Sequence, residues 1–357
     1  MYGLFAGLTT LDVAQLTADE VEENKKVTAL DQVLAAGGPA TNAAVVFSAL
    51  NRSKVRLAAR RKVSADRNGA HAGRSAATVL LTAVGDGPAA QLIATDVEAT
   101  DIALVDCTDY DAQPPANADE IDYTPTVSTI FVNAKTGART LASTNSRLPL
   151  RPDMATASLE AMGNPQVVLV DGHNPELGLA ALTYGTDPQA DDPFAAVDYE
   201  PPYLRILDGG SWKPWLTSML GFVDVAVLSG DFVAPGASSI AETVEFLRGF
   251  GITRVIQTNG AEATRWWWGE TSGELAPPGV DVVCTLAAGD VFHGAFAWGC
   301  VTGSLTRESD DPTAVIDFAN HIAALSTTVF GTRAWLHDYE TIEREVERLL
   351  DAEETRL

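Results

Sequence analysis

The chain has 357 residues, of which 24 are Lys or Arg and 48 are Asp or Glu, so its formal net charge at pH 7 is −24. This charge argues against nucleic acid and anionic membranes as partners, because affinity for phosphate backbones comes mostly from Lys and Arg. Hydrophobic residues make up 46% of the chain, enough for a large core, and few lysines beside many acids favour a salt-rich, halophilic cytoplasm.

The cysteines and the apolar runs exclude two further classes of protein. Cys107, Cys284 and Cys300 are far apart and show no CxxC spacing, which argues against a disulfide scaffold or a structural zinc site. No run of about eighteen apolar residues occurs, and no basic region precedes the first apolar run, so neither a membrane span nor a secretory signal is expected. We therefore expect a cytoplasmic protein.

Short apolar runs alternate with longer helical patterns along the chain, as in a parallel sheet whose two faces are covered by helices. The expected strands are residues 2–8, 79–84, 166–170, 205–207, 223–228 and 254–258. This order predicts an α/β protein. We expect residues 1–357 to form a single domain around one mostly parallel sheet.

Two segments break this rhythm because their polar and apolar residues alternate: residues 12–34 and residues 126–144. The second contains Ala134-Lys-Thr-Gly137, which has the composition of a hairpin turn. We predict that the two segments pair as a small separate sheet.

Two other segments are predicted to be surface insertions. Residues 51–76 hold eight of the 24 basic residues and one acid, so their net charge of +7 contrasts with the acidic remainder. A surface loop or disordered insertion is the main interpretation here, and a functional anion site is the alternative. Residues 184–203 are rich in Pro and Asp where a regular helix would be expected.

The strongest functional signal is CTLAAGDVFHGAFA at residues 284–297, which follows an apolar run and opens a helix. Small residues in this turn let the backbone approach a ligand, and the first N–H groups of a helix are unpaired at the positive end of its dipole. The turn is therefore a predicted anion site. Asp290 in this turn has two interpretations, a helix cap or a general base beside a phosphate.

These residues resemble the second signature of the ribokinase-like, or PfkB, family of carbohydrate kinases, D-T-x-G-A-G-D followed by a helix of small residues. AGGPATNAA at residues 36–44 resembles the family's first signature, and Asp12 stands where the family places a carboxylate that binds sugar hydroxyls. DGHN at 171–174 and DGGSWK at 208–213 are more similar to the ketohexokinase and sulfofructose kinase branch. The resemblance covers essentially the whole chain and implies the ribokinase-like fold.

The resemblance implies transfer of a phosphoryl group from ATP, with Mg²⁺, to a hydroxyl of a ketose such as fructose or of a keto-deoxy sugar acid. It implies that Asp290 is the catalytic base. It implies a backbone anion hole at Ala287, Ala288 and Gly289, sugar contacts at Asp12, Gly37, Gly38 and Asn42, and nucleotide contacts at Thr258, Gly260, Asn320 and Gly331. Residues 12–34 and 126–144 resemble the lid that closes over the sugar, and lid edges in this family often pair in a homodimer.

Two positions depart from the family pattern. Cys284 replaces the Asp of the signature, a position near the phosphates or a monovalent cation, and we interpret it as a small buried residue. The N-x-x-E metal motif of the family is absent near residues 229–232, which leaves Asp231 as the candidate that holds metal through water. His293 is interpreted as a structural histidine, or as a second base or phosphate ligand.

Two alternatives to a sugar kinase remain open. The departures from the signature are compatible with a non-catalytic relative that binds sugar or nucleotide as a sensor, although such a protein has no need of Asp290. Residues 85–90, GDGPAA, match a dinucleotide-binding loop, and Asp106 lies near the distance expected for a ribose carboxylate, which would indicate an NAD-dependent oxidoreductase. A negative charge at Asp86 argues against that loop.

Overall fold

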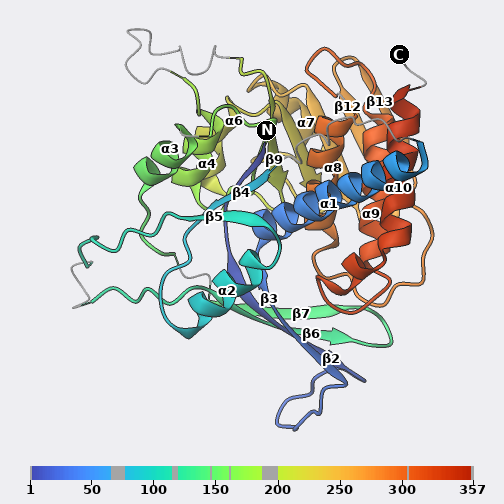
Figure 1. Ribbon diagram of the computed structural model, residues 1–357. Helices are drawn as coiled ribbons and strands as arrows, with labels where there is room; N and C mark the ends of the chain where they lie inside the picture. The colour runs from blue at the N-terminus through green and yellow to red at the C-terminus, as the bar shows by residue number, and fades with distance from the viewer. Residues whose placement is uncertain are drawn as a thin grey trace.

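The computed structural model describes residues 2–65, 77–114, 120–144, 147–160, 162–186, 200–303 and 305–354, and its strands form two sheets of different size (Figure 1). The large sheet has nine strands in the order β13-β12-β11-β10-β9-β8-β1-β4-β5. These strands are β1 (Tyr2–Ala6), β4 (Ala77–Thr82), β5 (Ile102–Asp106), β8 (Val167–Val170), β9 (Leu204–Gly209), β10 (Val225–Ser229), β11 (Arg254–Asn259), β12 (Glu262–Trp268) and β13 (Thr271–Leu275).

The large sheet is parallel from β5 to β11 and antiparallel at its β12–β13 edge. Its central strands are buried along their length, as strands covered on both faces must be. The edge strands follow one another through short turns at Gly260 and Gly269, both with positive φ. The six strands expected from the sequence are all present, whereas β5 and β13 were not expected.

Helices cover both faces of the large sheet, and each face has its own hydrophobic cluster (Figure 1). One cluster joins the sheet to α1 (Pro39–Ala65), α2 (Pro88–Glu98), α8 (Ala288–Thr302), α9 (Thr313–Ser326) and α10 (Tyr339–Glu354). The other joins it to α3 (Pro152–Glu160), α4 (Pro175–Leu182), α6 (Thr217–Leu220) and α7 (Ile240–Arg248). In the described part of the chain, no helix combines the length and apolar character needed to cross a bilayer.

Helix α1 corrects one expectation from the sequence. Residues 51–65 continue this helix and do not form a surface loop, while residues 66–76 lie outside the described part. The basic residues are accommodated by acidic partners: Arg56 donates to Glu343 of α10 at 2.8 Å, and Arg60 also donates to Glu343. Leu57 of the same stretch is buried in the core. Charge pattern alone suggested an insertion because the acidic partner is distant in sequence.

The small sheet has the order β3-β2-β6-β7, from strands β2 (Thr10–Thr17), β3 (Asp31–Gly37), β6 (Val127–Asn133) and β7 (Arg139–Ser143). It confirms the predicted second sheet, and Figure 1 shows it below the large one. Ile130 and Val132 face inward and are fully buried against Cys284 and Leu286. Leu141 of β7, by contrast, is 52% exposed.

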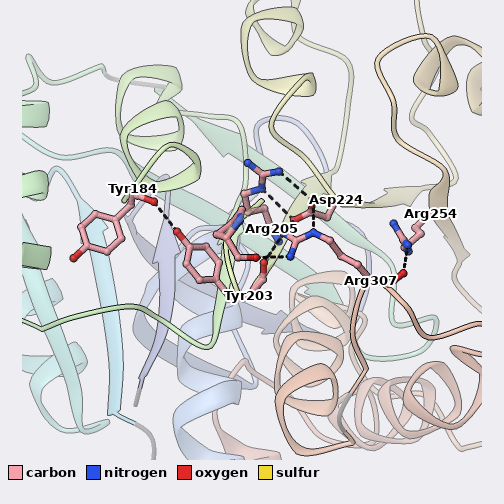
Figure 2. Close-up of polar contacts among 7 residues, drawn as sticks. Tyr184, Tyr203, Arg205, Asp224, Arg254 and Arg307 are labelled. Atoms are coloured by element: carbon pink, nitrogen blue, oxygen red, sulfur yellow. Dashed lines mark hydrogen bonds and ion pairs between the residues drawn. The ribbon is translucent and has the colours of Figure 1, made fainter. Parts of the chain in front are cut away.

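A cluster of ion pairs fastens the loop after α8 to the amino ends of β9 and β10 (Figure 2). Arg205 and Arg307 both donate to Asp224, at 3.1 Å and 2.6 Å, and Arg307 also donates to the carbonyl oxygen of Tyr203 at 2.6 Å. Tyr203 in turn donates to the carbonyl oxygen of Tyr184 at 2.8 Å. Residues 187–199 of the second expected insertion lie outside the described part, but both of its ends are tied to the core.

Candidate active site

The expected functional residues gather where the parallel strands end. In open α/β sheets, ligands bind beyond the carboxyl ends of the strands. Asp171 directly follows β8, Asp208 is near the end of β9, and Asp290 begins α8 beside them. Oδ2 of Asp171 accepts the N–H groups of Leu8 at 2.8 Å and Ala40 at 3.2 Å, so it joins the end of β1 to the start of α1.

Asp290 lies in the first turn of α8, where it is half-buried. Its Oδ2 accepts a hydrogen bond of 2.8 Å from Nδ2 of Asn42, a residue in the first turn of α1. Burial, together with repulsion from Asp208, raises the pKa of Asp290 to about 7, and the hydrogen bond from Asn42 opposes this rise. A carboxyl group with this pKa can accept and release a proton near neutral pH.

Asp12 and the glycines of residues 36–44 form a second part of the site. Asp12 is 8% exposed, and its Oδ1 accepts a hydrogen bond of 2.6 Å from Oγ1 of Thr10. Burial raises the pKa of Asp12. A Cβ at Gly37 would lie 2.0 Å from the Asp12 carboxylate, so only glycine leaves room for this side chain. Gly38 has a φ of +93°, and a Cβ there would lie 2.3 Å from the carbonyl oxygen of Leu8.

Asp208 and His293 face each other inside the protein, an arrangement that the sequence did not predict. Nδ1 of His293 lies 3.3 Å from Oδ2 of Asp208, and neither atom has a hydrogen-bond partner among the described residues. Nε2 of His293 lies 3.3 Å from the carbonyl oxygen of Val227, so this nitrogen carries the proton of a neutral ring. Nδ1 then presents a lone pair to the Asp208 carboxyl group.

A proton on Asp208 resolves this contact between two acceptors. Burial raises the pKa of Asp208 to about 8, and burial lowers the pKa of His293. One ligand atom from each of Asp208, Asp290 and His293 also lies within 4.8 Å of the others, which is a geometry that suits a divalent cation. Such a cation would occupy the Asp290 carboxylate and compete with its use as a base.

Arg333 is a second site residue that the sequence analysis missed. It precedes the short 3₁₀ helix η2 (Ala334–His337), and its guanidinium donates to Oδ1 of Asn42 at 3.1 Å and to the carbonyl oxygen of Ala36 at 2.5 Å. Asp96 of α2 lies 3.5 Å away as its ionic partner. Both ends of the Asn42 amide are therefore fixed, one by Arg333 and the other by Asp290. Its position two residues after Gly331 was the only available sequence signal.

The turn before α8 contains the residues of the expected anion hole. Ala287 has a φ of +60°, a left-handed conformation that costs an alanine roughly 1 kcal/mol. The first N–H groups of α8 have no acceptor within the helix, and that of Ala288 bonds back to Thr285 at 3.4 Å. The small sheet reaches this turn, because Arg139 of β7 donates to the carbonyl oxygen of Thr285 at 2.8 Å. Cys284 is buried among apolar side chains, as expected.

The expected nucleotide residues do not form a single cluster. Thr258 and Gly260 lie at the end of β11, and a Cβ at Gly230 would lie 2.6 Å from Oδ1 of Asn259. Asp231 is exposed beside them at the end of β10. Two other expected contacts lie elsewhere: Asn320 is buried in α9, where its Oδ1 accepts a 2.8 Å bond from Thr264, and Gly331 packs against Val33 of β3.

The competing dinucleotide loop is filled by the chain itself. A Cβ at Gly85 would lie 2.0 Å from the carbonyl oxygen of Tyr123, and Asp86 donates its N–H to the same oxygen at 2.9 Å. Asp106, the expected ribose carboxylate, accepts hydrogen bonds from Val84, Thr108 and Tyr110. These contacts make residues 85–90 a structural turn.

Comparison with known proteins supports the resemblance. Residues 228–338 match the model of the pfkB family carbohydrate kinases. The 1-phosphofructokinase of Escherichia coli K12 is 38% identical over 96 residues, which is 26% of this chain and only 28% of that enzyme's length. Ribokinase from Giardia lamblia superposes with a TM-score of 0.69 at 15% identity, covering 97% of this chain and 99% of that one. Arabidopsis thaliana ribokinase, solved with ribose and ATP, gives 0.63 at 16% identity, covering 97% and 98%. The predicted ribokinase-like α/β fold is confirmed.

Proposed function

We propose that this chain, which carries a pfkB family carbohydrate kinase domain on a ribokinase-like fold, transfers the γ-phosphoryl group of ATP to a hydroxyl of a small carbohydrate. The observation that carries the proposal is the placement of Asp290. Its carboxylate is oriented by Asn42 at 2.8 Å, lies in the first turn of α8, where the N–H groups have no acceptor within the helix, and has a pKa raised to about 7.

In this reaction Asp290 accepts the proton of the acceptor hydroxyl while the hydroxyl oxygen attacks the γ-phosphorus. The bond between that phosphorus and the leaving ADP oxygen breaks, and ADP departs. Backbone N–H groups of Ala287, Ala288 and Gly289 stabilise the charge on the transferred group, because they lie at the positive end of the α8 dipole. Positioning and charge stabilisation supply most of the catalysis in phosphoryl transfer.

Sugar binding falls to residues of the small sheet and of the first turn of α1, which follows it. Asp12 accepts hydrogen bonds from acceptor hydroxyls, Gly37 and Gly38 let the backbone approach the sugar, and Asn42 donates beside the base. The small sheet acts as the lid, which excludes water as a competing acceptor. Its contact with the anion-hole turn, through Arg139 and Thr285, supports this role because closure can then order the turn.

The oxygen donors near the end of β10 fit Mg²⁺. Magnesium prefers oxygen ligands and usually keeps several waters. Asp231 is an exposed carboxylate, and the Asn259 amide oxygen lies near Gly230 beside it, so these two side chains would hold Mg²⁺ bound to ATP. The ion would offset the negative charge of the phosphates. A monovalent cation remains part of the proposal, although Cys284 cannot supply the carboxylate of the family signature.

The lid also presents surface for a homodimer. Leu34 of β3 and Leu141 of β7 are 46% and 52% exposed on the two edge strands of the small sheet. We infer that these edges pair between two chains of a cytoplasmic protein adapted to high salt. Sedimentation equilibrium of the wild type in concentrated KCl should give twice the monomer mass, and the Leu34→Asp, Leu141→Asp variant should sediment as a monomer.

The kinase proposal is tested by ADP production from Mg²⁺-ATP in concentrated KCl, with ketoses, aldoses and sugar acids as acceptors. Sugar-dependent turnover should be lost in Asp290→Asn, while Asp101→Asn, an exposed acid on another surface, should keep it. If no sugar releases ADP but ATP or a sugar still raises the melting temperature, the chain is a non-catalytic binding relative. NAD alone raising the melting temperature would instead favour the dinucleotide alternative.

A further inference from the structure

Three basic side chains gather beyond the carboxyl ends of β8 and β9, next to the candidate active site. His173 follows β8, Lys213 follows β9, and Arg147 comes from the segment after the small sheet. The two strands are parallel neighbours, so their ends meet at one edge of the sheet. A basic cluster at this edge is unexpected in a chain with a net charge of −24.

Arg147 is held in place by an aromatic ring. Its guanidinium carbon lies 4.1 Å from the centre of the Trp215 ring, a cation–π contact. Nε1 of Trp215 donates to the carbonyl oxygen of Gly172 at 2.8 Å, which fixes the ring beside the residue that precedes His173. No ion pair to Arg147 occurs among the described residues. Its hydrogen-bond donors are therefore oriented but not consumed by a carboxylate.

Lys213 is half-buried at the same edge. Its ammonium group has one hydrogen bond among the described residues, of 3.4 Å to the carbonyl oxygen of Ser211 in its own loop. Burial lowers the pKa of Lys213, and the nearby Asp171 and Asp208 carboxyl groups counter this. Lys213 also lowers the pKa of His173, as does Arg147, so the three bases lie near one another.

The acids at this edge do not cancel the bases. Asp171 already accepts N–H groups from Leu8, Ala40 and His173, which commits its negative charge to the backbone. Asp208 is buried, its Oδ2 lies 3.3 Å from Nδ1 of His293, and no ion pair joins it to Arg147 or Lys213 among the described residues. Arg147 and Lys213 are therefore left without an ion-pair partner among the described residues.

We propose that the acceptor sugar carries an anionic group, a phosphate or a carboxylate, which binds between Arg147 and Lys213 while its reacting hydroxyl reaches Asp290. This inference rests on the proposed kinase function and specifies its substrate class. Asp208 lies between the two ends of such an acceptor. It is near Lys213, and one of its carboxylate oxygens lies within 4.8 Å of a carboxylate oxygen of Asp290. Arg suits this role because its planar donors match both anions.

The test is equilibrium binding by calorimetry without nucleotide, so that it does not depend on turnover. The probes are fructose, fructose 1-phosphate and 2-keto-3-deoxygluconate, which carry no charge, a phosphate and a carboxylate. The wild type should bind one anionic probe at least tenfold more tightly than fructose, and the tighter of the two identifies the group. Lys213→Gln and Arg147→Gln should each weaken that probe at least tenfold and change fructose binding less than twofold.

Two further variants separate a specific site from a general effect. Lys213→Arg should retain most of the affinity because it keeps the charge, and Arg344→Gln, on the exposed side of α10, should change nothing. Equal affinity for fructose and both anions, or equal loss of all three probes in Lys213→Gln, overturns the inference. ATP turnover on fructose without anion preference would overturn it and leave the kinase intact. Selective anion binding without ADP release would sustain it while the kinase proposal fails.

Discussion

Asn42 donates a 2.8 Å hydrogen bond to the Asp290 carboxylate, and this bond joins the first turns of two helices that are 248 residues apart in sequence. Arg333 holds the other end of the same amide. The direction of the Asp290 carboxylate is therefore set by two side chains from separate segments of the chain, and either can be changed without altering the carboxylate itself.

The Asn42→Ala variant should lose kcat by roughly 100-fold, because a misplaced reacting group costs about that much and Asp290 would no longer be oriented. Steady-state ADP production measures this loss. Arg333→Gln should reduce kcat in the same direction but less, since Asn42 keeps its bond to Asp290. Circular dichroism spectra that match the wild type would separate this effect from misfolding, and an unchanged kcat in Asn42→Ala would contradict the assigned geometry.

The pH dependence of kcat should follow the titration of Asp290. The base must be deprotonated, so activity should rise with pH and level off above about 7. The charged groups around Asp290 are Asp208 from β9, Asp12 from β2, His293 from α8 and Arg333. Asp208 repels the Asp290 carboxylate whenever Asp208 is itself charged, so Asp208→Asn should shift the midpoint to lower pH.

The same groups link stability to pH. Asp208 and Asp290 have folded pKa values of about 8 and 7, above the 3.8 of an exposed Asp, so their contribution to stability is fully present below about pH 4, declines as pH rises, and is lost above the folded pKa values. Urea unfolding between pH 5 and 9 should show a free energy of unfolding that declines up to about pH 8 and levels off above it. Asp208→Asn should flatten the decline, and a decline as steep as that of the wild type would count against the assignment.

Ala287→Gly should raise the free energy of unfolding by about 0.5–1 kcal/mol. The left-handed conformation at this position is sterically strained for alanine, whereas glycine adopts it readily. Glycine loses more conformational entropy on folding, which reduces the gain. Thermal unfolding measures the change. The neighbouring Ala288→Gly variant is the matched control, because Ala288 is helical and the substitution should destabilise.

Asp224→Asn should destabilise the protein by about 3–5 kcal/mol, because Arg205 would remain as an uncompensated buried charge and Arg307 would lose its ionic partner. Asp317→Asn, which removes a partly exposed pair with Arg348, should cost less than about 1 kcal/mol. Equal losses in the two variants would mean that the buried cluster contributes no more than a surface pair. Neither Asp224 nor Asp317 lies near Asp290, so the folded fraction of each variant should keep the kcat of the wild type.

Sequence reasoning found the residues that belong to local patterns and missed those that the fold brings together. Asp12, Gly37, Asn42 and Asp290 stand in short signatures, and the structure places them at one site. Arg333 follows no such pattern, because its contacts with Ala36 and Asn42 cross almost 300 residues. The role of Asp208 was hidden for the same reason: its partner His293 lies on a helix 85 residues later.

The three cysteines differ in what surrounds them, and this gives the protein a natural reporter of lid position. Cys107 and Cys300 lie within the two large clusters that cover the main sheet, and burial raises the pKa of both thiols. Cys284 is buried by the inner face of the small sheet, against Ile130 and Val132. A thiol reagent should therefore label Cys284 only while the small sheet is lifted, and saturating acceptor should slow that labelling in the native protein without any engineered probe.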